Sequence, residues 1–138
     1  MEKTLVLIKP DAFEKHHVGD IVKRYEEAGF QILAMKALKM TKEVAAKHYA
    51  EHIGRPYYGE LESFMTSGPI VALVLAADNV IAAVRELHGK TDPKEAAPGT
   101  IRQLYAESKG CNAVHASDSP ESAAREIHIF FNETEIFD

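Results

Sequence analysis

The sequence predicts a mixed α/β or α+β domain with about four strands. Apolar runs typical of buried strands alternate with segments that carry apolar residues at helical spacing, and glycine or proline stands at most of the boundaries between them. A chain of 138 residues is the usual size of one domain, so we expect a single domain over residues 1–138. This pattern leaves the order and direction of the strands open.

The first half of the chain gives clear strand and helix signals. Thr4–Ile8 is a short apolar run that stops before Pro10, which predicts a buried strand. Residues 19–28 place apolar side chains on one helical face, and Gly29 is a typical helix stop. The next predicted elements are one extended segment and two helices, over residues 30–40, 41–52 and 57–65.

The second half begins with Ile70–Leu75, whose unbroken apolar character predicts a strand buried on both faces. Asp78 is expected to cap a helix that runs to Leu87. The remaining predicted elements are a loop over 89–98, a short helix from Thr100, a strand over 113–115 and a helix that starts at Ser119-Pro120.

Composition excludes several classes of function. The chain carries 21 acidic and 16 basic residues, a net charge of −5, which argues against nucleic acid or an anionic membrane as partner. Cys111 is the only cysteine, so an intrachain disulfide is impossible and a reducing compartment is favoured. The apolar run near the start is too short for a secretion signal or a membrane span. We therefore expect a cytoplasmic protein.

Two short motifs suggest chemistry that their neighbours do not support. His88-Gly-Lys-Thr91 resembles the end of a phosphate-binding loop, but Val84 stands where that loop requires glycine. His48 and His52 are four residues apart on a predicted helix, yet Tyr49 occupies the position of the glutamate found in zinc proteases. The sequence therefore predicts no metal site held by protein ligands.

His115 has a more suggestive setting. Glu126 lies about two helical turns beyond Ser119, on the flank of the apolar stripe of the last helix, where it could hydrogen-bond one imidazole nitrogen. A neutral imidazole held in this way is an activated nucleophile. A structural histidine at the end of a strand is the alternative, and the residues alone leave both open.

Four cationic residues stand beside predicted element ends or loops, where binding groups are common: Lys9, Arg55, Arg85 and Arg102. If they converge in the fold, they suit a polyphosphate, because arginine makes forked contacts with phosphate oxygens. Taken one at a time, each fits an ordinary solvated surface charge better than a binding group.

Over essentially its whole length the sequence resembles the nucleoside diphosphate kinases. The segments that carry the resemblance are TLVLIKPDA, HYAEHIGRPYY, SGPIVALVL, PGTIR, and NAVHASDS followed by ESAAREI. The resemblance implies a ferredoxin-like βαββαβ fold, a four-stranded antiparallel sheet covered by helices. It also implies ping-pong transfer of the terminal phosphate of a nucleoside triphosphate, such as ATP, to a nucleoside diphosphate through a phosphohistidine.

The resemblance assigns roles to individual residues. His115 is the nucleophile, Glu126 holds its other ring nitrogen, and Ser117 lies close to this pair. His52 matches a phosphate-side histidine, and Tyr57 matches the aromatic residue that stacks on the base. The positions that bind phosphates and ribose are Lys9, Tyr49, Arg55, Arg85, Thr91, Arg102 and Asn112. Mg²⁺ is expected to arrive with the nucleotide, held by its phosphates.

Stacking on Tyr57 implies little discrimination between bases, so ATP, GDP, CDP, UDP and deoxy forms are the expected substrates. Homo-oligomers, tetramers or hexamers, are expected as well. Two departures from the family pattern affect these expectations: Gln103-Leu104-Tyr105 alters a loop that helps to hold subunits together, and Lys109 replaces an aliphatic wall of the base slot. A non-catalytic nucleotide-binding or phosphohistidine regulatory member of the same fold is the alternative function.

Overall fold

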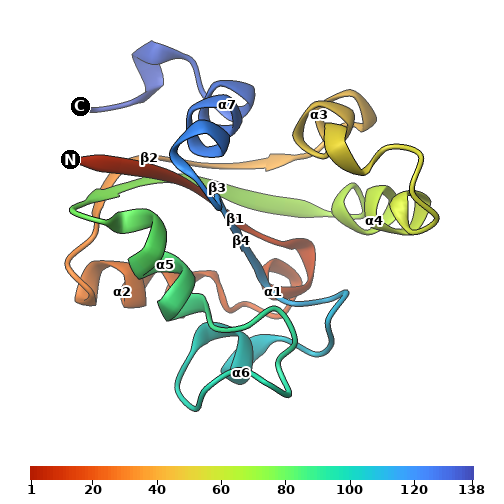
Figure 1. Ribbon diagram of the computed structural model, residues 1–138, viewed down its shortest axis with the longest axis horizontal. Coiled ribbons are helices and arrows are strands. Elements are labelled where there is room, and N and C mark those ends of the chain that lie inside the picture. The colour runs from red at the N-terminus through yellow and green to blue at the C-terminus, as the bar shows by residue number, and fades with distance from the viewer.

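The computed structural model describes residues 1–138 and is built on a four-stranded antiparallel sheet (Figure 1). The strands are β1 (Glu2–Ile8), β2 (Gln31–Lys39), β3 (Pro69–Ala77) and β4 (Val114–Ala116), in the order β2-β3-β1-β4. Both β1 and β2 are antiparallel to β3, so they run in the same direction with β3 between them. This split βαβ topology confirms the predicted ferredoxin-like fold.

Helices cover both faces of the sheet (Figure 1). They are α1 (Pro10–Glu14), α2 (Val18–Glu27), α3 (Lys42–His48), α4 (Tyr58–Met65), α5 (Val80–His88), α6 (Ile101–Tyr105) and α7 (Pro120–Phe130), with 3₁₀ turns η1 (Ala50–His52) and η2 (Glu133–Glu135). α1, α2, α5 and α6 pack on one face, whereas α3, α4 and α7 pack on the other. None of these helices is long and apolar enough to span a bilayer.

The two inner strands, β1 and β3, are buried on both faces, as the unbroken apolar runs predicted. Successive side chains of a strand point to opposite faces. Val6 and Ile8 therefore join the core beneath α2 and α5, while Leu5 and Leu7 join the core beneath α3 and α7. Leu7 pairs with His115 across β1 and β4, so the register turns His115 toward α3 and α7.

Three predicted helix starts are confirmed by side-chain caps. Thr41 accepts from Val44 N at 3.2 Å, Thr100 from Gln103 N at 3.3 Å, and Ser119 from Ser122 N at 3.1 Å. These are the start sites of α3, α6 and α7. Each of these helix starts could be predicted from local sequence, because the side-chain hydroxyl lies only three residues before the amide that it satisfies.

Two helix predictions are wrong in part. The helix expected over 41–52 ends at His48, because Tyr49 leaves helical geometry (φ −103°, ψ 30°) and a 3₁₀ turn follows. Asp78 does not cap α5: Asn79 is the N-cap residue, and the carboxylate of Glu2 accepts the Ile81 N–H at 2.9 Å. A distant side chain thus supplies a cap that local sequence cannot reveal.

α1 was not predicted, because Pro10 was interpreted only as the end of the preceding strand. Proline is also favoured in the first helical turn, where its missing N–H breaks no hydrogen bond. The structure uses it in this way: Lys9 is extended (φ −75°, ψ 166°), and Pro10 begins the helix. Lys9 therefore lies at the junction between β1 and α1.

Candidate active site

A cleft of about 1310 Å³ opens beside the C-terminal end of β1 and the N-terminal end of β4. Its walls are almost entirely polar or charged. Nine of the residues predicted for the site line it: Lys9, Tyr49, His52, Arg85, Thr91, Arg102, Asn112, His115 and Glu126. Ser117 lies behind this wall in the core, and Arg55 and Tyr57 lie outside the lining, on the exposed segment before α4.

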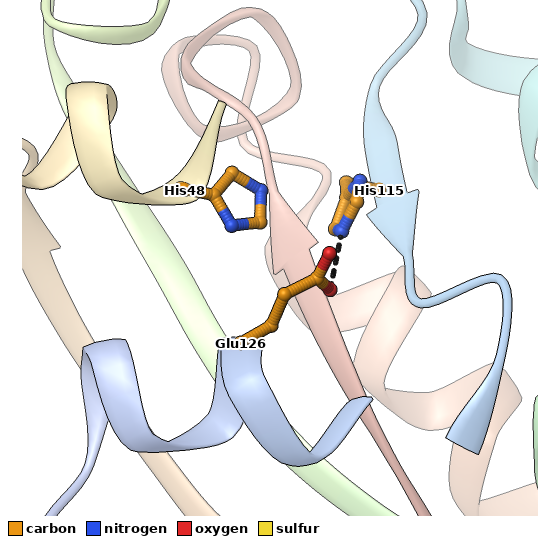
Figure 2. Close-up of side chains that lie close together, drawn as sticks. All are labelled: His48, His115 and Glu126. Atoms are coloured by element: carbon orange, nitrogen blue, oxygen red, sulfur yellow. Dashed lines mark hydrogen bonds and ion pairs between the residues drawn. The ribbon is translucent and has the colours of Figure 1, made fainter. Parts of the chain in front are cut away.

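His115 and Glu126 form the central pair of the cleft. Figure 2 shows the Glu126 carboxylate, from α7, turned toward the His115 ring on β4. Glu126 Oε1 lies 3.0 Å from His115 Nε2. A carboxylate at this distance favours the tautomer whose Nε2–H donates to it, which leaves the Nδ1 lone pair free. Burial lowers the pKa of His115 below its usual 6.5, so the ring is neutral at pH 7.

Glu126 is held from its other side by Ser117. The Ser117 hydroxyl donates to Glu126 Oε1 at 2.8 Å, and the Leu5 N–H donates to Ser117 Oγ at 3.2 Å. Burial would raise the pKa of Glu126, but the hydrogen bonds from His115 and Ser117 and the nearby imidazoles outweigh it and hold the pKa below its usual value. The carboxylate is therefore ionised, and it is anchored to β1 through Ser117.

Lys9 reaches the cleft from the end of β1. Its ammonium donates to Asn112 Oδ1 at 2.8 Å, and Asn112 Nδ2 in turn donates to the Thr91 carbonyl at 3.4 Å. Burial, with the charge of Arg102 as a second cause, lowers the pKa of Lys9 to about 8. A desolvated ammonium of this kind attracts an anion more strongly than a surface lysine does.

The backbone that leads into β4 is tightly fixed. Ala113 adopts a left-handed conformation (φ +73°), which is uncommon for a residue with a side chain. Its N–H donates to Asp11 Oδ2 at 3.0 Å, and its carbonyl accepts from the Lys9 N–H at 2.8 Å. The turn therefore ties the start of β4 to the junction of β1 and α1. Lys9, Asn112 and His115 are positioned by the same hydrogen bonds.

Arg102 is held by backbone carbonyls from two directions. Its Nη1 donates to the Gly89 carbonyl and its Nη2 to the Val114 carbonyl, both at 2.9 Å. Burial, followed by the charge of Arg85, lowers the pKa of Arg102 to about 10. The guanidinium is still charged at pH 7, and it is fixed in place next to His115 before any ligand arrives.

The outer part of the cleft is more exposed. His52 Nδ1 lies 2.5 Å from the Tyr57 hydroxyl, and the Tyr57 ring is 48% exposed. Lys109, which stands where the family pattern has an aliphatic residue, also lines the cleft. Arg55 is exposed on the same segment as Tyr57.

The altered run after Arg102 is anchored within the chain. Tyr105 donates its hydroxyl to the carboxylate of Asp20 on α2, and Arg24 Nε donates to the same carboxylate at 3.1 Å. The Tyr105 ring also stacks on His17, with 4.4 Å between ring centroids. These contacts attach α6, and with it Arg102, to α2.

Two buried histidines at the site were not predicted. His48 is only 4% exposed, and its ring centroid lies 4.7 Å from that of His115. His88 is fully buried beneath the cleft, with Nε2 2.7 Å from the Tyr25 hydroxyl. In the sequence, His48 stood out only for its spacing from His52, whereas in the structure its ring lies against that of His115. His88 stood out only as part of a resemblance to a phosphate-binding loop, and its contact with Tyr25 was not predicted.

Together these side chains present a neutral imidazole to an anion-binding cleft. The free Nδ1 of His115 can attack an electrophilic atom, and Lys9, Arg85 and Arg102 can neutralise a phosphate group brought there. Glu126 can stabilise the positive charge that the ring acquires when it is substituted. The arrangement suits phosphoryl transfer through a covalent histidine intermediate.

Comparisons with known proteins agree with this chemistry. Residues 2–136 match the family model described as nucleoside diphosphate kinase. The chain is 55% identical over 136 residues to a nucleoside diphosphate kinase from Desulfatibacillum aliphaticivorans, with 99% of each chain covered. It is 56% identical over 136 residues to that of Psychromonas ingrahamii, covering 99% of this chain and 94% of the relative.

Solved structures agree as well. The Aquifex aeolicus nucleoside diphosphate kinase superposes with a TM-score of 0.96 at 48% identity, covering 98% of both chains. The Halobacterium salinarum enzyme, solved in complex with CDP, has a TM-score of 0.96 at 41% identity over 99% of this chain and 91% of that one. The resemblance found in the sequence is confirmed. The chain belongs to the nucleoside diphosphate kinase family.

Proposed function

We propose that His115 is the residue through which this chain transfers the terminal phosphate of a nucleoside triphosphate to a nucleoside diphosphate. Family membership makes the chain a nucleoside diphosphate kinase, a phosphotransferase. The residue assignment is supported above all by the 3.0 Å contact between His115 Nε2 and Glu126 Oε1, on the wall of a cleft that Lys9, Arg85 and Arg102 also line.

The transfer takes two balanced steps. The Nδ1 lone pair of His115 forms a bond to the terminal phosphorus, the bond from that phosphorus to the bridging oxygen breaks, and the first nucleoside diphosphate leaves. A second diphosphate then attacks the phosphohistidine with its terminal oxygen, the P–N bond breaks, and the electron pair returns to Nδ1. One site thus serves donor and acceptor in turn.

The surrounding residues align the phosphates and neutralise their charge, which is the main part of phosphoryl-transfer catalysis. Lys9 and Arg102, each already held by hydrogen bonds, face the transferred group, with Arg85 nearer the solvent. The Tyr49 hydroxyl is buried and has no protein partner, so it suits a donor to a phosphate oxygen. Asn112 and Thr91 complete the phosphate and ribose contacts, with His52 and Arg55 at the outer phosphates.

Tyr57 provides the stacking surface for the base, and its exposed ring supports broad use of ATP, GDP, CDP and UDP. The CDP bound to the halophilic relative supports a nucleoside diphosphate as ligand. Mg²⁺ fits this cleft as a partner of the phosphates, since the side chains proposed to face them are chiefly cations and neutral donors. When bound with the nucleotide, the ion neutralises phosphate charge.

The proposal extends to a cytoplasmic homo-oligomer, a tetramer or hexamer, with no nucleic acid or membrane partner. β2 is an edge strand and Met35 on it is 54% exposed, which supports a partner subunit along that edge. Light scattering measures the mass in solution. A monomeric mass at micromolar concentration would contradict the oligomer.

The decisive experiment follows the labelled phosphate. The protein is incubated with Mg²⁺ and ATP labelled at the terminal phosphate, tested for acid-labile, alkali-stable label, and chased with GDP, CDP and UDP. His115→Ala should abolish the label. His128→Ala, which changes an exposed histidine on α7, should retain it and serves as the matched control.

Each result has a clear reading. Rapid label that all three diphosphates remove supports the proposed reaction and its breadth. Label that survives in His115→Ala would contradict the residue assignment. Label that no diphosphate removes would favour the phosphohistidine regulatory alternative over the enzyme.

A further inference from the structure

One side chain of the cleft, His48, has no place in the proposed reaction. It projects from the C-terminal end of α3 and is only 4% exposed. Neither of its ring nitrogens has a hydrogen-bond partner. A buried imidazole normally satisfies at least one nitrogen, because an unpaired buried polar group is destabilising. An unpaired nitrogen beside the reactive centre therefore points to a ligand.

His48 is directed at the central pair rather than at His52. Its ring meets that of His115 edge-on, with an angle of 81° between the ring planes. Figure 2 shows His48, His115 and Glu126 converging from α3, β4 and α7. One ring nitrogen of each histidine and one carboxylate oxygen of Glu126 all lie within 4.8 Å of one another.

We propose that His48, His115 and Glu126 bind a zinc-like divalent transition metal ion, and that the bound ion prevents phosphorylation of His115. Two imidazoles and one carboxylate form a donor set that zinc uses in proteins, with a water molecule as the fourth ligand. Mg²⁺ prefers oxygen ligands, so the Mg²⁺ that accompanies the nucleotide does not compete well here. The inhibitory half of this proposal rests on the proposed function.

The geometry is close to that of a bound site. Tetrahedral coordination with bonds of about 2.0–2.1 Å separates ligand atoms by about 3.3 Å. The His115–Glu126 contact, at 3.0 Å, already has nearly this separation. Ligand atoms now up to 4.8 Å apart must approach by about 1.5 Å to reach this spacing. The proposal requires that His48 supply this movement by a change in its side-chain torsions.

Inhibition follows from the tautomer of His115. In the metal-free protein Glu126 keeps the proton on Nε2, and the lone pair on Nδ1 is free to attack phosphorus. A neutral imidazole has only one lone pair. A metal ion bound at Nε2 uses that pair and leaves the proton on Nδ1. The ring then has no lone pair to offer the nucleotide.

Metal binding is tested directly on the full-length, metal-free protein. Co²⁺ is added as a spectroscopic substitute, and Zn²⁺ binding is measured by calorimetry. We expect one ion per chain and the intense visible absorption of tetrahedral Co²⁺, which Zn²⁺ abolishes. In H48Q the affinity for Zn²⁺ should fall by more than the roughly 10- to 100-fold that loss of an outer-shell partner causes.

Two further variants keep this test decisive. H115Q removes a second ligand and should weaken Zn²⁺ binding to a similar extent, so the result does not depend on the folding of H48Q alone. H128Q changes an exposed histidine outside the cluster and should bind as the unmodified protein does. Octahedral Co²⁺ absorption, or affinity unchanged in both H48Q and H115Q, would overturn the metal site.

The inhibitory half has its own readout. Single-turnover labelling with Mg²⁺ and ATP is compared between metal-free protein and protein carrying one equivalent of Zn²⁺. We expect the labelling rate to fall at least tenfold with zinc and to recover on addition of a zinc-selective chelator. Equal rates would overturn the inhibition. If the metal-free protein does not label at all, the proposed function has failed, and the Co²⁺ spectrum still decides the metal site.

Discussion

The hydroxyl of Ser117 donates a 2.8 Å hydrogen bond to the same oxygen of Glu126 that contacts the imidazole of His115. Ser117 is fully buried and does not line the cleft, so it lies outside the proposed nucleotide site. Its backbone N–H is bonded to the Leu5 carbonyl at 3.1 Å. The serine thus links the orientation of Glu126 to the central strand.

Replacement of Ser117 by alanine should therefore slow phosphorylation without removing the nucleophile. A hydrogen bond to a charged group contributes about 1.5–3 kcal/mol, which corresponds to roughly a 10- to 100-fold loss in rate if Glu126 is misoriented. Single-turnover labelling measures this rate. Ser119→Ala is the control: it removes the α7 cap and lowers stability by about 1 kcal/mol, with the labelling rate retained. Equal rates for Ser117→Ala and the unmodified protein would exclude the positioning role.

Lys9 should give kcat/KM an alkaline limb near pH 8. Its pKa of about 8 means that the ammonium is present below this pH and is lost above it, so phosphate binding weakens as the pH rises. Lys9→Arg carries a charge that persists to much higher pH, so this limb should disappear. The next loss is then expected near pH 10, where Arg102 titrates. A limb that stays near pH 8 in Lys9→Arg would assign it to another group.

The buried pair Tyr25 and His88 should make stability sensitive to acid. Burial lowers the pKa of His88 well below 6.5, so below pH 6.5 the unfolded chain binds a proton that the folded chain excludes. Stability is therefore fully present above pH 6.5 and falls below it by about 1.4 kcal/mol per pH unit for this one group. Urea unfolding at pH 7, 6 and 5 measures the slope.

The double variant Tyr25→Phe, His88→Leu removes both partners of that pair, leaving no orphaned hydroxyl. Below pH 6.5 this variant should take up one proton fewer on unfolding than the unmodified protein does. Its free energy of unfolding should therefore fall less steeply as the pH is lowered. His48 and His115, whose pKa values are also lowered, remain in both proteins and cancel in the comparison. An identical slope in the two proteins would show that His88 is protonated without cost in the folded state.

Gly89 should tolerate no side chain. It has a positive φ of +87°, and a Cβ there would lie 2.6 Å from Thr100 Oγ1. The Gly89 carbonyl also holds Arg102 at 2.9 Å. With ψ at 178° the backbone of Gly89 lies in a region that is essentially restricted to glycine. Gly89→Ala is expected to lower the free energy of unfolding by well over the roughly 1–3 kcal/mol of the backbone strain alone, and to weaken nucleotide binding. Chemical denaturation and nucleotide titration measure the two effects.

Gly29→Ala is the control for a positive φ without a close contact. Gly29 has the same φ of +87°, but a Cβ there would meet nothing within 4 Å. Gly29→Ala should therefore lower the free energy of unfolding by only about 1–2 kcal/mol, and the variant should bind nucleotide normally. Similar losses in both variants would mean that Thr100 moves aside and that the close approach at Gly89 is unimportant.

Much of the fold was predictable because its signals are local. The apolar runs of β1 and β3 follow from burial on both faces, and the caps at Thr41, Thr100 and Ser119 lie three residues from the amides that they satisfy. The missed start at Pro10 and the early end of α3 at Tyr49 have local causes, whereas the error at the start of α5 arose because the deciding group is distant in sequence. Glu2 caps α5 across the sheet, so Asp78 was assigned a role that it does not have.

The sequence by itself determined the family and most of the strands and helices, and through the family resemblance it paired His115 with Glu126, eleven residues further along the chain. The tertiary structure alone brought Lys9 to Asn112, showed that Ser117 donates to Glu126 at 2.8 Å, and set His48 against His115. Those contacts join β1, β4, α3 and α7. Antiparallel pairing of β1 with β4 fixes which side chains share a face, and no local pattern encodes that register.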